Sequence, residues 1–595
     1  MKHLNHQDLE AAFPSRQYPK RLANQVEALE IIGNEKGSVI LEMPTGSGKT
    51  AVGYTFLKAL EQQGAGPLFY VVPTKTLVEQ VHQLHPDVTV AYGRHEHPCL
   101  YYDDQPKADE IPCSMLVDCA HRVDQETGET FEPGATLCPY LLQKYQAKQS
   151  GIVVCTSAFY LFTQLFSREW GEPAGLVIDE AHRLPQTVRG LLSYEISDLH
   201  LWRAVNLLAF MDEEQAANLE RFTKKMIHLV RRKASRASTL LEDHEIADLL
   251  DELAQVDPQK VRKAVAQAVQ TGVIDTLEQR ETLRKLELLT YNLRRYIHSL
   301  EYSLPSQGRH PLNYTYAYFR TDLIGNEKAQ HWLFIKSYYV APIIKRILSP
   351  RTLAFSATIG DPEIFQYETG IKAPAYALGS DFPAGNTRVF LPKDTPNLAV
   401  KGRIRAEPTK VLRRVAKACK SFAKSGMRSL VVVVSNVERE KFLRLCAEEE
   451  VNVLSYGGEV APKDVAARFK AGEGDVLVGT VSNYGEGVDL PKSIAPVIFF
   501  LRPSYPNPRD PGTLFEERRF GSMRWRLWNW RVMLEALQVR GRNVRSSADV
   551  GVTFFISQQF RRFLYGALPE WLRESYCGDK TFEQCIEDAK ELLRN

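Results

Sequence analysis

The sequence predicts an α/β protein in which apolar strands alternate with helices, and three stretches of the 595 residues indicate this. A short apolar run at 38–41 leads through a glycine-rich loop into a helical pattern at 50–60. A second apolar run, at 176–178, ends in two carboxylates, and a third, at 476–480, has the composition of a fully buried strand. Buried strands combined with helices are typical of parallel sheets.

The loop that joins the first apolar run to its helix is the most informative motif in the chain. Its residues are Met43, Pro44, Thr45, Gly46, Ser47, Gly48, Lys49 and Thr50. Glycines let backbone amides approach phosphate oxygens, and the N-terminus of the following helix contributes its positive end. We expect Lys49 to neutralise the β- and γ-phosphates and the Thr50 hydroxyl to hold Mg²⁺. A chance strand–turn–helix is the alternative, and the flanking pattern disfavours it, so the motif predicts a nucleoside triphosphate site.

Two adjacent carboxylates, Asp179 and Glu180, follow the apolar strand at 176–178. An ATPase that uses Mg²⁺ needs one acid to hold the metal through water and a second acid to align the attacking water. Asp179 suits the first role and Glu180 the second. A solvated strand end is the alternative, but the phosphate loop upstream favours the functional interpretation. His182 either couples this site to neighbouring motifs or is a surface histidine, and the sequence leaves both open.

Length and composition narrow the class of protein. A chain of 595 residues is too long for one hydrophobic core, so we expect about three or four domains. The net charge is only +3, so a nucleic-acid surface would have to come from local basic clusters. No run of about eighteen apolar residues occurs and the first ten residues lack the apolar core of a secretory signal, so we expect no membrane span and no export. Nine cysteines without an export signal favour a reducing, cytoplasmic location.

A phosphate loop followed by Asp-Glu-Ala-His resembles the superfamily 2 helicases. This resemblance implies tandem RecA-like motor domains, two α/β units with parallel sheets that face each other across ATP. Other motifs follow in the same order: Gln25 matches the adenine-reading glutamine, and the loop at 73–77 is similar to the loop that touches the nucleic-acid backbone. Ser356-Ala357-Thr358 resembles the motif that links hydrolysis to strand movement. Each match is weak alone, and their order makes them informative together.

The second half of the chain resembles the second motor domain of these helicases. Gln538, Arg542 and Arg545 match the signature Gln-x-x-Gly-Arg-x-x-Arg, whose arginines reach the γ-phosphate from the opposite domain. Such an arginine stabilises charge on the transferred phosphoryl group, and its loss costs roughly three to five decades in rate. An arginine-rich surface helix would be the usual interpretation of a lone match, but four matching positions disfavour it.

Two motif variants resemble the XPD/DinG family in particular. One is Glu-Gly-Val-Asp-Leu-Pro at 486–491, whose Glu486 and Asp489 are expected to bind the nucleotide. The other is Leu-Glu-Met-Pro-Thr-Gly at 41–46, in which Met43 stands where Gly or Ala usually opens the phosphate loop. The resemblance covers essentially the whole chain and implies an ATP-dependent DNA helicase.

Four of the nine cysteines, Cys99, Cys113, Cys119 and Cys138, lie between the phosphate loop and Asp179. The resemblance implies that they hold a 4Fe-4S cluster in a small domain pinned against the first motor domain, and thiolates suit such a cluster. Thirteen, five and eighteen residues separate them, whereas the family more often has a Cys-x-x-Cys pair in the middle. A zinc site that uses neighbouring histidines and a set of unliganded buried cysteines are the alternatives.

The domain order follows from the positions of these motifs. We expect motor domain 1 at 1–93, 151–195 and 305–378, the cluster domain at 94–150, a helical domain at 196–304, and motor domain 2 at 379–595. The helical domain is predicted from leucines at helical spacing, and it lies where the resembled family carries its arch domain. We expect the chain to rejoin motor domain 1 at the strand-like residues 332–335.

Basic stretches provide candidate surfaces for a nucleic acid. They occur at 224–233, 403–420 and 518–545, and the last also holds tryptophans at positions 525, 528 and 530. Phosphates attract arginine and lysine, and single-stranded bases stack on aromatic faces, so this stretch suits a single-strand track. A solvated helix with its tryptophans in the core is an equal alternative. Lys75 and Arg94 are expected to touch the strand, because the resemblance places them beside it.

These features predict an ATP-dependent 5′-to-3′ DNA helicase of the XPD/DinG type, with the polarity and the preference for DNA implied by the family. Its cofactors would be ATP, Mg²⁺ and a 4Fe-4S cluster. Its partners would be single-stranded DNA and duplex junctions, bound by a monomer of bacterial- or phage-like origin. An ATP-driven translocase or remodeller that unwinds little is one alternative. An ATP-switched scaffold without turnover is another, and Glu180 and Arg542 argue against it.

Overall fold

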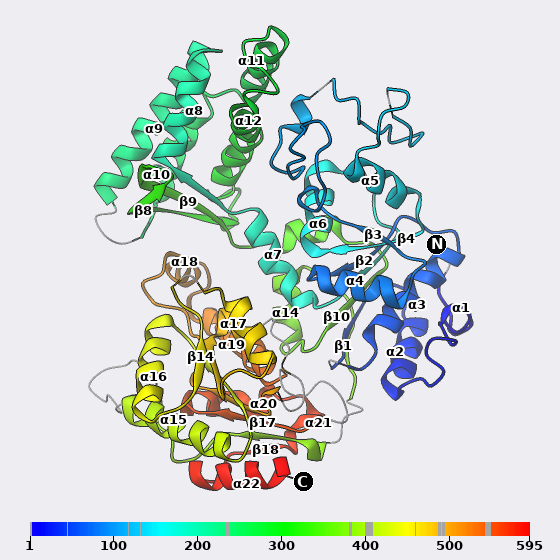
Figure 1. The fold of residues 1–595 in the computed structure, drawn as a ribbon, viewed down its shortest axis with the longest axis vertical. Helices are drawn as coiled ribbons and strands as arrows, with labels where there is room; N and C mark the ends of the chain where they lie inside the picture. The colour runs from blue at the N-terminus through cyan, green and yellow to red at the C-terminus, as the bar shows by residue number, and fades with distance from the viewer. Residues whose placement is uncertain are drawn as a thin grey trace.

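The computed structural model describes residues 3–594 except 45, 117, 131, 234–237, 380–383, 399–407, 459, 486–489, 491–493 and 542–548. The described residues form two parallel sheets of seven strands each and one antiparallel sheet of four strands. Figure 1 shows the two parallel sheets in separate lobes, with a helical insertion at the top left. The predicted fold class, α/β with two RecA-like parallel-sheet domains and insertions, is confirmed.

The first parallel sheet carries the phosphate loop and has the strand order β11-β1-β10-β5-β2-β4-β3. Its strands are β1 (Val39–Glu42), β2 (Leu68–Val72), β3 (Thr89–Ala91), β4 (Ile152–Thr156), β5 (Gly175–Ile178), β10 (Thr352–Ser356) and β11 (Ala375–Ala377). Its helices include α1 (His6–Ala12), α2 (Ala23–Asn34), α3 (Lys49–Gln62), α4 (Lys75–Leu84), α5 (Pro139–Gln149), α6 (Ser157–Phe162), α7 (Leu184–Leu191), α13 (Ala341–Ile344) and α14 (Pro362–Thr369). Because β1, β10 and β5 are neighbours, the three loops that follow them meet at one edge of the sheet.

The second parallel sheet has the strand order β14-β15-β13-β16-β17-β12-β18. Its strands are β12 (Thr387–Phe390), β13 (Ser429–Val433), β14 (Val453–Ser455), β15 (Val476–Thr480), β16 (Val497–Phe500), β17 (Gly551–Phe555) and β18 (Tyr576–Cys577). Its helices are α15 (Pro408–Lys424), α16 (Asn436–Glu448), α17 (Pro462–Lys470), α18 (Pro511–Phe520), α19 (Arg524–Arg540), α20 (Leu564–Ala567), α21 (Glu570–Arg573) and α22 (Phe582–Arg594). All five residues of β13, of β15 and of β17 are buried, which explains their continuous apolar sequences.

The helical insertion contains more than the helices that the sequence predicts. Helices α8 (Asp198–Ala209), α9 (Glu213–Lys233), α10 (Asp243–Leu253), α11 (Pro258–Gln270) and α12 (Arg280–Glu301) pack on an antiparallel sheet of order β6-β9-β8-β7. The sheet strands are β6 (Tyr194–Ser197), β7 (Thr239–Leu240), β8 (Asn313–Ile324) and β9 (Glu327–Ser337). We call these helices and strands together the arch.

The expectation that residues 332–335 rejoin the first motor domain is wrong. They lie in β9, which pairs antiparallel with β6 and β8, and the chain returns to the first parallel sheet only at β10. Leu333 and Ile335 belong to the same core as the arch helices, whereas Trp332 and Phe334 pack on the other face of the strand. Apolar side chains on both faces made this stretch resemble a buried parallel strand, so the sequence could not identify its sheet.

The cysteine-rich segment between β3 and α5 is mostly loop, with two short 3₁₀ turns at Arg94–Glu96 and Cys113–Met115. Several contacts attach it to the arch, among them an ion pair of Asp104 with Arg280 on α12. The Tyr102 hydroxyl donates to the Thr276 carbonyl at 2.7 Å, and the Ser114 amide donates to Glu287 Oε1 on α12 at 2.9 Å. Met115 is buried in the arch core. The segment therefore connects the first motor domain to the arch.

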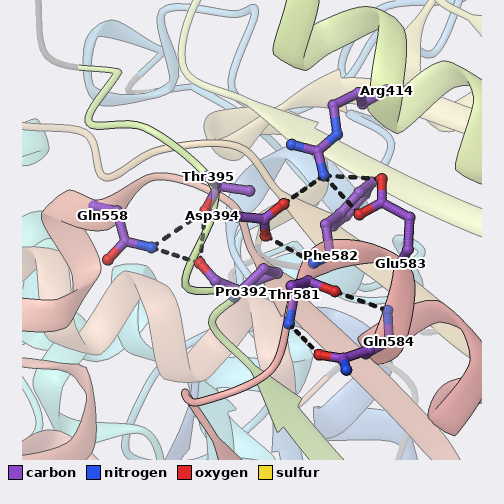
Figure 2. A network of polar contacts seen from close by, with 9 residues as sticks. All are labelled: Pro392, Asp394, Thr395, Arg414, Gln558, Thr581, Phe582, Glu583 and Gln584. Carbon is purple, nitrogen blue, oxygen red and sulfur yellow. Dashed lines mark hydrogen bonds and ion pairs between the residues drawn. The ribbon is translucent and has the colours of Figure 1, made fainter.

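A polar network fastens the C-terminal helix α22 to the second motor domain (Figure 2). Asp394 Oδ1 accepts the Phe582 amide at 2.8 Å, and Asp394 Oδ2 accepts from Arg414 at 2.7 Å. Arg414 also donates to both carboxylate oxygens of Glu583 at 2.9 Å. Because Arg414 lies on α15, one guanidinium joins two helices and the loop that follows β12.

Within the ranges that the structure describes, no helix has both the length and the apolar surface to cross a membrane.

Candidate active site

The phosphate loop lies between β1 and α3, as its sequence predicts. Gly46 has a φ of +82° and Gly48, which caps α3, has a φ of +78°, a conformation that side chains disfavour. A Cβ atom on Gly48 would lie 2.2 Å from Gln25 Nε2. The Ser47 hydroxyl donates to the Pro44 carbonyl at 2.7 Å and closes the loop. Backbone geometry therefore favours glycine at both positions, and close packing requires it at Gly48.

Gln25, expected to read adenine, lies on α2 directly against this loop. Its Nε2 donates to the Gly48 carbonyl at 3.4 Å, and its Oε1 accepts the Leu22 amide at 3.0 Å. The side chain is 2% exposed. In this state Gln25 therefore supports the N-terminal end of α3.

Lys49 points from α3 toward the two carboxylates after β5. Its Nζ lies 3.2 Å from Glu180 Oε1 and 3.9 Å from Asp179 Oδ1. Burial raises the pKa of Asp179, and Lys49 only partly opposes this. Burial by itself would also raise the pKa of Glu180, but Lys49 and His182 outweigh burial, so the pKa of that carboxyl is lowered. The structure thus brings the predicted lysine and both predicted acids together, with Glu180 the more strongly ionised acid.

The backbone at Glu180 is strained. Its φ of 51° and ψ of 49° place a non-glycine residue in the left-handed region. Such conformations cost about 1–3 kcal/mol and tend to occur at functional sites. The turn aims the Glu180 side chain at Lys49, while its own amide donates to Asp179 Oδ1 at 3.0 Å.

Thr50, expected to hold Mg²⁺, faces β2. Its side chain lies beside the hydroxyl of Tyr70, a fully buried residue whose pKa is raised by burial and by Asp179. Thr50 and Asp179 therefore have Tyr70 as a common neighbour. A hydroxyl and a carboxylate so placed suit a hard divalent cation.

His182 joins the two motor domains, which resolves the alternatives that the sequence left open. Its side chain is 5% exposed, so it is not a surface histidine. Its Nδ1 lies 2.9 Å from Oγ of Ser356, the last residue of β10, and its Nε2 is hydrogen-bonded to Gln538 Nε2 on α19. Because the Gln538 amide donates to Nε2, the proton of the His182 ring is assigned to Nδ1. The Ser356 hydroxyl in turn donates to the Thr358 carbonyl at 2.6 Å. Glu180, His182, Ser356 and Gln538 form one continuous chain of polar contacts.

The three tryptophans of the basic stretch at 518–545 were expected either to form part of a single-strand track or to lie in the core of a solvated helix. The structure supports a different interpretation for different tryptophans. Trp528 and Trp530 are 6% and 5% exposed, and Trp530 donates to the Ile359 carbonyl at 2.8 Å. Trp525 is 48% exposed and lies edge-on to Trp528. Two of the three rings are therefore core, as the solvated-helix interpretation requires, and Trp525 alone of the three presents a face to solvent.

The four clustered cysteines line one small pocket together with Arg94 and Tyr140. Burial raises the pKa of Cys99, Cys119 and Cys138, and each of these thiols also interacts with other members of the set. No group of three or more His, Cys, Asp or Glu side chains in the described part of the chain lies close enough to hold a single metal ion. The four thiols therefore share one pocket, and thiolates are the ligands that iron–sulfur clusters use.

The two residues expected to touch a nucleic acid lie near this segment in different settings. Lys75 begins α4 and pairs with Glu96, and its side chain is 54% exposed. Arg94 donates to the carbonyls of Ala108 and Ile111, the latter at 3.0 Å. Arg94 therefore organises the loop around the cysteine pocket, whereas Lys75 remains accessible. Five further predicted site residues lie outside the described residues: Thr45, Glu486, Asp489, Arg542 and Arg545.

Two family models match separate parts of the chain. Residues 13–208 match the type III restriction enzyme res subunit, and residues 418–575 match the helicase C-terminal domain. A search of curated proteins finds no match.

Solved structures resemble the chain over nearly its whole length. A structure titled XPD_Helicase has a TM-score of 0.57 and 16% identity, over 96% of this chain and 99% of that one. XPD_APO has a TM-score of 0.53 and 15% identity, over 91% and 97%. The structure of S. tokodaii Xpd4 has a TM-score of 0.55 and 12% identity, over 94% and 99%.

The fold is that of the XPD structures. The match of residues 418–575 to the helicase C-terminal domain agrees with this likeness of fold.

Glu42 was missed by sequence reasoning. Its Oε2 accepts the Ile359 amide at 2.6 Å, and burial raises its pKa. Ile359 also receives the Trp530 hydrogen bond from α19, so the last residue of β1, the loop after β10 and the second motor domain are linked. The signal in the sequence was an acid directly before the phosphate loop. The sequence does not show which distant residue such an acid contacts, so it could not assign Glu42 a role.

Proposed function

We propose that the chain is an ATP-dependent 5′-to-3′ DNA helicase of the XPD/DinG type. The observation that supports this best is the chain of contacts from Lys49 through Glu180 and His182 to Gln538. It joins the phosphate loop to the second motor domain through the acid proposed to align water. Hydrolysis that changes this chain of contacts would change how the two motor domains sit against each other, which is what a translocating motor requires.

Each residue in the site has a proposed role. Lys49 binds the β- and γ-phosphates, Thr50 and Asp179 hold Mg²⁺, and Glu180 orients the attacking water. Arg542 and Arg545 complete the site from the second motor domain. Gln25, which supports the phosphate loop in this state, reads adenine when nucleotide is bound.

The four cysteines are proposed to hold a 4Fe-4S cluster. When bound, the cluster would supply a rigid cross-link between loop segments that otherwise have little regular structure. Cys113 begins the turn that docks on the arch through Ser114 and Met115, so its thiolate would hold this docking turn in place. Zinc is the alternative occupant, and metal analysis of anaerobically purified protein distinguishes them.

The test of function is phosphate release measured with and without single-stranded DNA, beside strand displacement on duplexes with 5′ or 3′ tails. We expect release to rise with single-stranded DNA and unwinding to require a 5′ tail. Lys49→Ala should abolish both activities. DNA-stimulated release without strand displacement would favour the translocase or remodeller, and no DNA-stimulated release from the intact chain would refute the motor.

A further inference from the structure

Four charged side chains meet where both motor domains and the arch converge, and the proposed nucleotide site uses none of them. They are Arg189 on α7, Glu368 on α14, Glu516 on α18 and Arg531 on α19. Glu368 and Glu516 are each 3% exposed. Buried carboxylates persist only where cations and hydrogen-bond donors compensate them, and two arginines face these two acids. We call these four residues the charge clamp.

Glu368 is shared between the two motor domains. Its Oε2 lies 2.6 Å from Arg189 of the first domain, and its Oε1 lies 3.4 Å from Arg531 of the second. The two arginines outweigh burial and lower the pKa of Glu368, so its charge is retained. Arg531 donates on its other side to Glu516. One arginine therefore joins α14 of the first domain to α18 of the second.

Tyr338 connects the clamp to the arch. It directly follows β9, at the root of the arch sheet, and is 5% exposed. Its hydroxyl donates to Glu516 Oε1 at 2.8 Å, and its carbonyl accepts from Arg189 Nε at 2.7 Å. The arch root is thus bonded to an acid of one motor domain and an arginine of the other.

The clamp and the nucleotide site are connected by two helices. Arg531 and Gln538 lie seven residues apart on α19, so they share one face of that helix, about two turns apart. On the first motor domain, α7 starts at Leu184, just after His182, and carries Arg189. Gln538 contacts His182, and Arg531 contacts Glu368, which also binds Arg189. These contacts therefore fasten α19 to the first motor domain beside those that Arg526 and Trp530 make.

We propose that Glu368 and Glu516 are positioning residues that hold α19 in register, so that Gln538 meets His182, and that Tyr338 transmits movement of α19 to the arch. The catalytic consequence rests on the helicase function proposed above, whereas the positioning does not. The clamp supplies the buried charged contacts among those that fix α19, so its release lets Gln538 shift relative to His182.

The chain contains a matched control. Glu363, like Glu368, lies on α14 and pairs with an arginine of α19, Arg526 at 2.7 Å, but its side chain is 78% exposed. Glu368→Gln removes the charge from the clamp while the side-chain volume stays the same. Glu363→Gln makes the same change on the surface. Tyr338→Phe removes only the hydroxyl that binds Glu516.

Two measurements test the proposal. In amide hydrogen exchange, α19 peptides of Glu368→Gln should exchange about tenfold faster than those of the parent, whereas Glu363→Gln should match the parent. In DNA-stimulated phosphate release, Glu368→Gln should lower kcat about tenfold or more and leave the affinity for a non-hydrolysable ATP analogue within about twofold. Tyr338→Phe should keep kcat within about twofold and raise the ATP consumed per base pair unwound about threefold.

Equal exchange and equal kcat in Glu368→Gln and Glu363→Gln would overturn the proposal. If Tyr338→Phe consumes as much ATP per base pair as the parent, Tyr338 does not transmit movement of α19 to the arch. If Glu368→Gln does not fold, Glu516→Gln and Tyr338→Phe are compared with Glu363→Gln by hydrogen exchange instead. If the parent shows no DNA-stimulated release, the helicase proposal fails, and the exchange of α19 still decides whether the clamp positions that helix.

Discussion

Lys49 Nζ lies 3.2 Å from Glu180 Oε1, so the cation expected to meet the phosphates is held by the acid expected to align water. The two groups follow β1 and β5 at one edge of the sheet, and both side chains are largely buried. A triphosphate that binds Lys49 must compete with this carboxylate. The ion pair therefore sets part of the free energy of nucleotide binding.

Glu180→Gln should bind ATP more tightly than the parent, because neutral glutamine competes less for Lys49. A partly buried pair of this kind is worth about 1 kcal/mol, or roughly fivefold in affinity. Phosphate release should fall by about two to four decades, because the water loses its general base. Equilibrium binding and single-turnover release measure the two effects. Weaker binding by Glu180→Gln would contradict this role, and Lys49→Ala is the control that should lose binding.

Gln538→Ala should lower kcat for ATP and leave nucleotide affinity nearly unchanged. The substitution removes the described contact of Gln538 with His182, and a small misplacement of a catalytic domain costs about ten- to hundredfold in rate. Asn529→Ala is the control, because Asn529 lies on the exposed side of the same helix and accepts a hydrogen bond from the Tyr505 hydroxyl. Equal kcat in the two variants would mean that the contact does not transmit closure.

Cys138→Ala should lose most of the roughly four iron atoms expected per chain, because each cysteine of a 4Fe-4S site supplies one ligand. Cys155→Ala is the matched control, since Cys155 is buried in β4 away from the cysteine pocket. Iron, sulfide and zinc contents of anaerobic protein measure the outcome. Stoichiometric zinc in the parent, or equal iron in both variants, would rule out the cluster.

Arg414→Ala should loosen α22, because Arg414 joins that helix to α15 and to Asp394. These groups are about one-third exposed, so we expect a loss of only about 0.5–1 kcal/mol in local stability. Arg413→Ala, the neighbouring residue that pairs with Glu448 on the surface, is the control. The protection of α22 amides from hydrogen exchange should fall only in Arg414→Ala, and equal protection would contradict the anchor.

The ion pair of Arg414 with Asp394 predicts that the local stability of α22 depends on pH. Burial raises the pKa of Asp394, but the hydrogen bond from Arg414 and other donors outweigh it, so the folded pKa is lower than the unfolded value. A depressed carboxyl pKa contributes stability that is full above the unfolded pKa and is lost as the pH falls through the folded pKa. The difference in α22 protection between parent and Arg414→Ala should therefore be constant above about pH 5 and shrink below about pH 4. A difference that grows on acidification would contradict this.

The local signals in the sequence were strong where backbone chemistry is specific. Gly46 and Gly48 adopt positive φ angles that only glycine accepts readily, so the phosphate loop could be identified with its strand and helix. The carboxylates at 179 and 180 follow a strand whose four residues are all buried, and they lie beside Lys49. The ambiguous features were those that depend on a partner: His182, the tryptophans and the strand at 332–335.

The sequence by itself determined the alternation of buried strands and helices and the order of the motifs, because backbone preferences and hydrophobic periodicity are local properties. Only the tertiary structure decided that His182 meets Gln538, that β9 belongs to the arch, and that Glu42 and Glu368 have buried partners. Such contacts join residues hundreds of positions apart. The free energy of such a contact depends on desolvation and on geometry where the two residues meet. Neither property can be predicted from the sequence around one of the two residues.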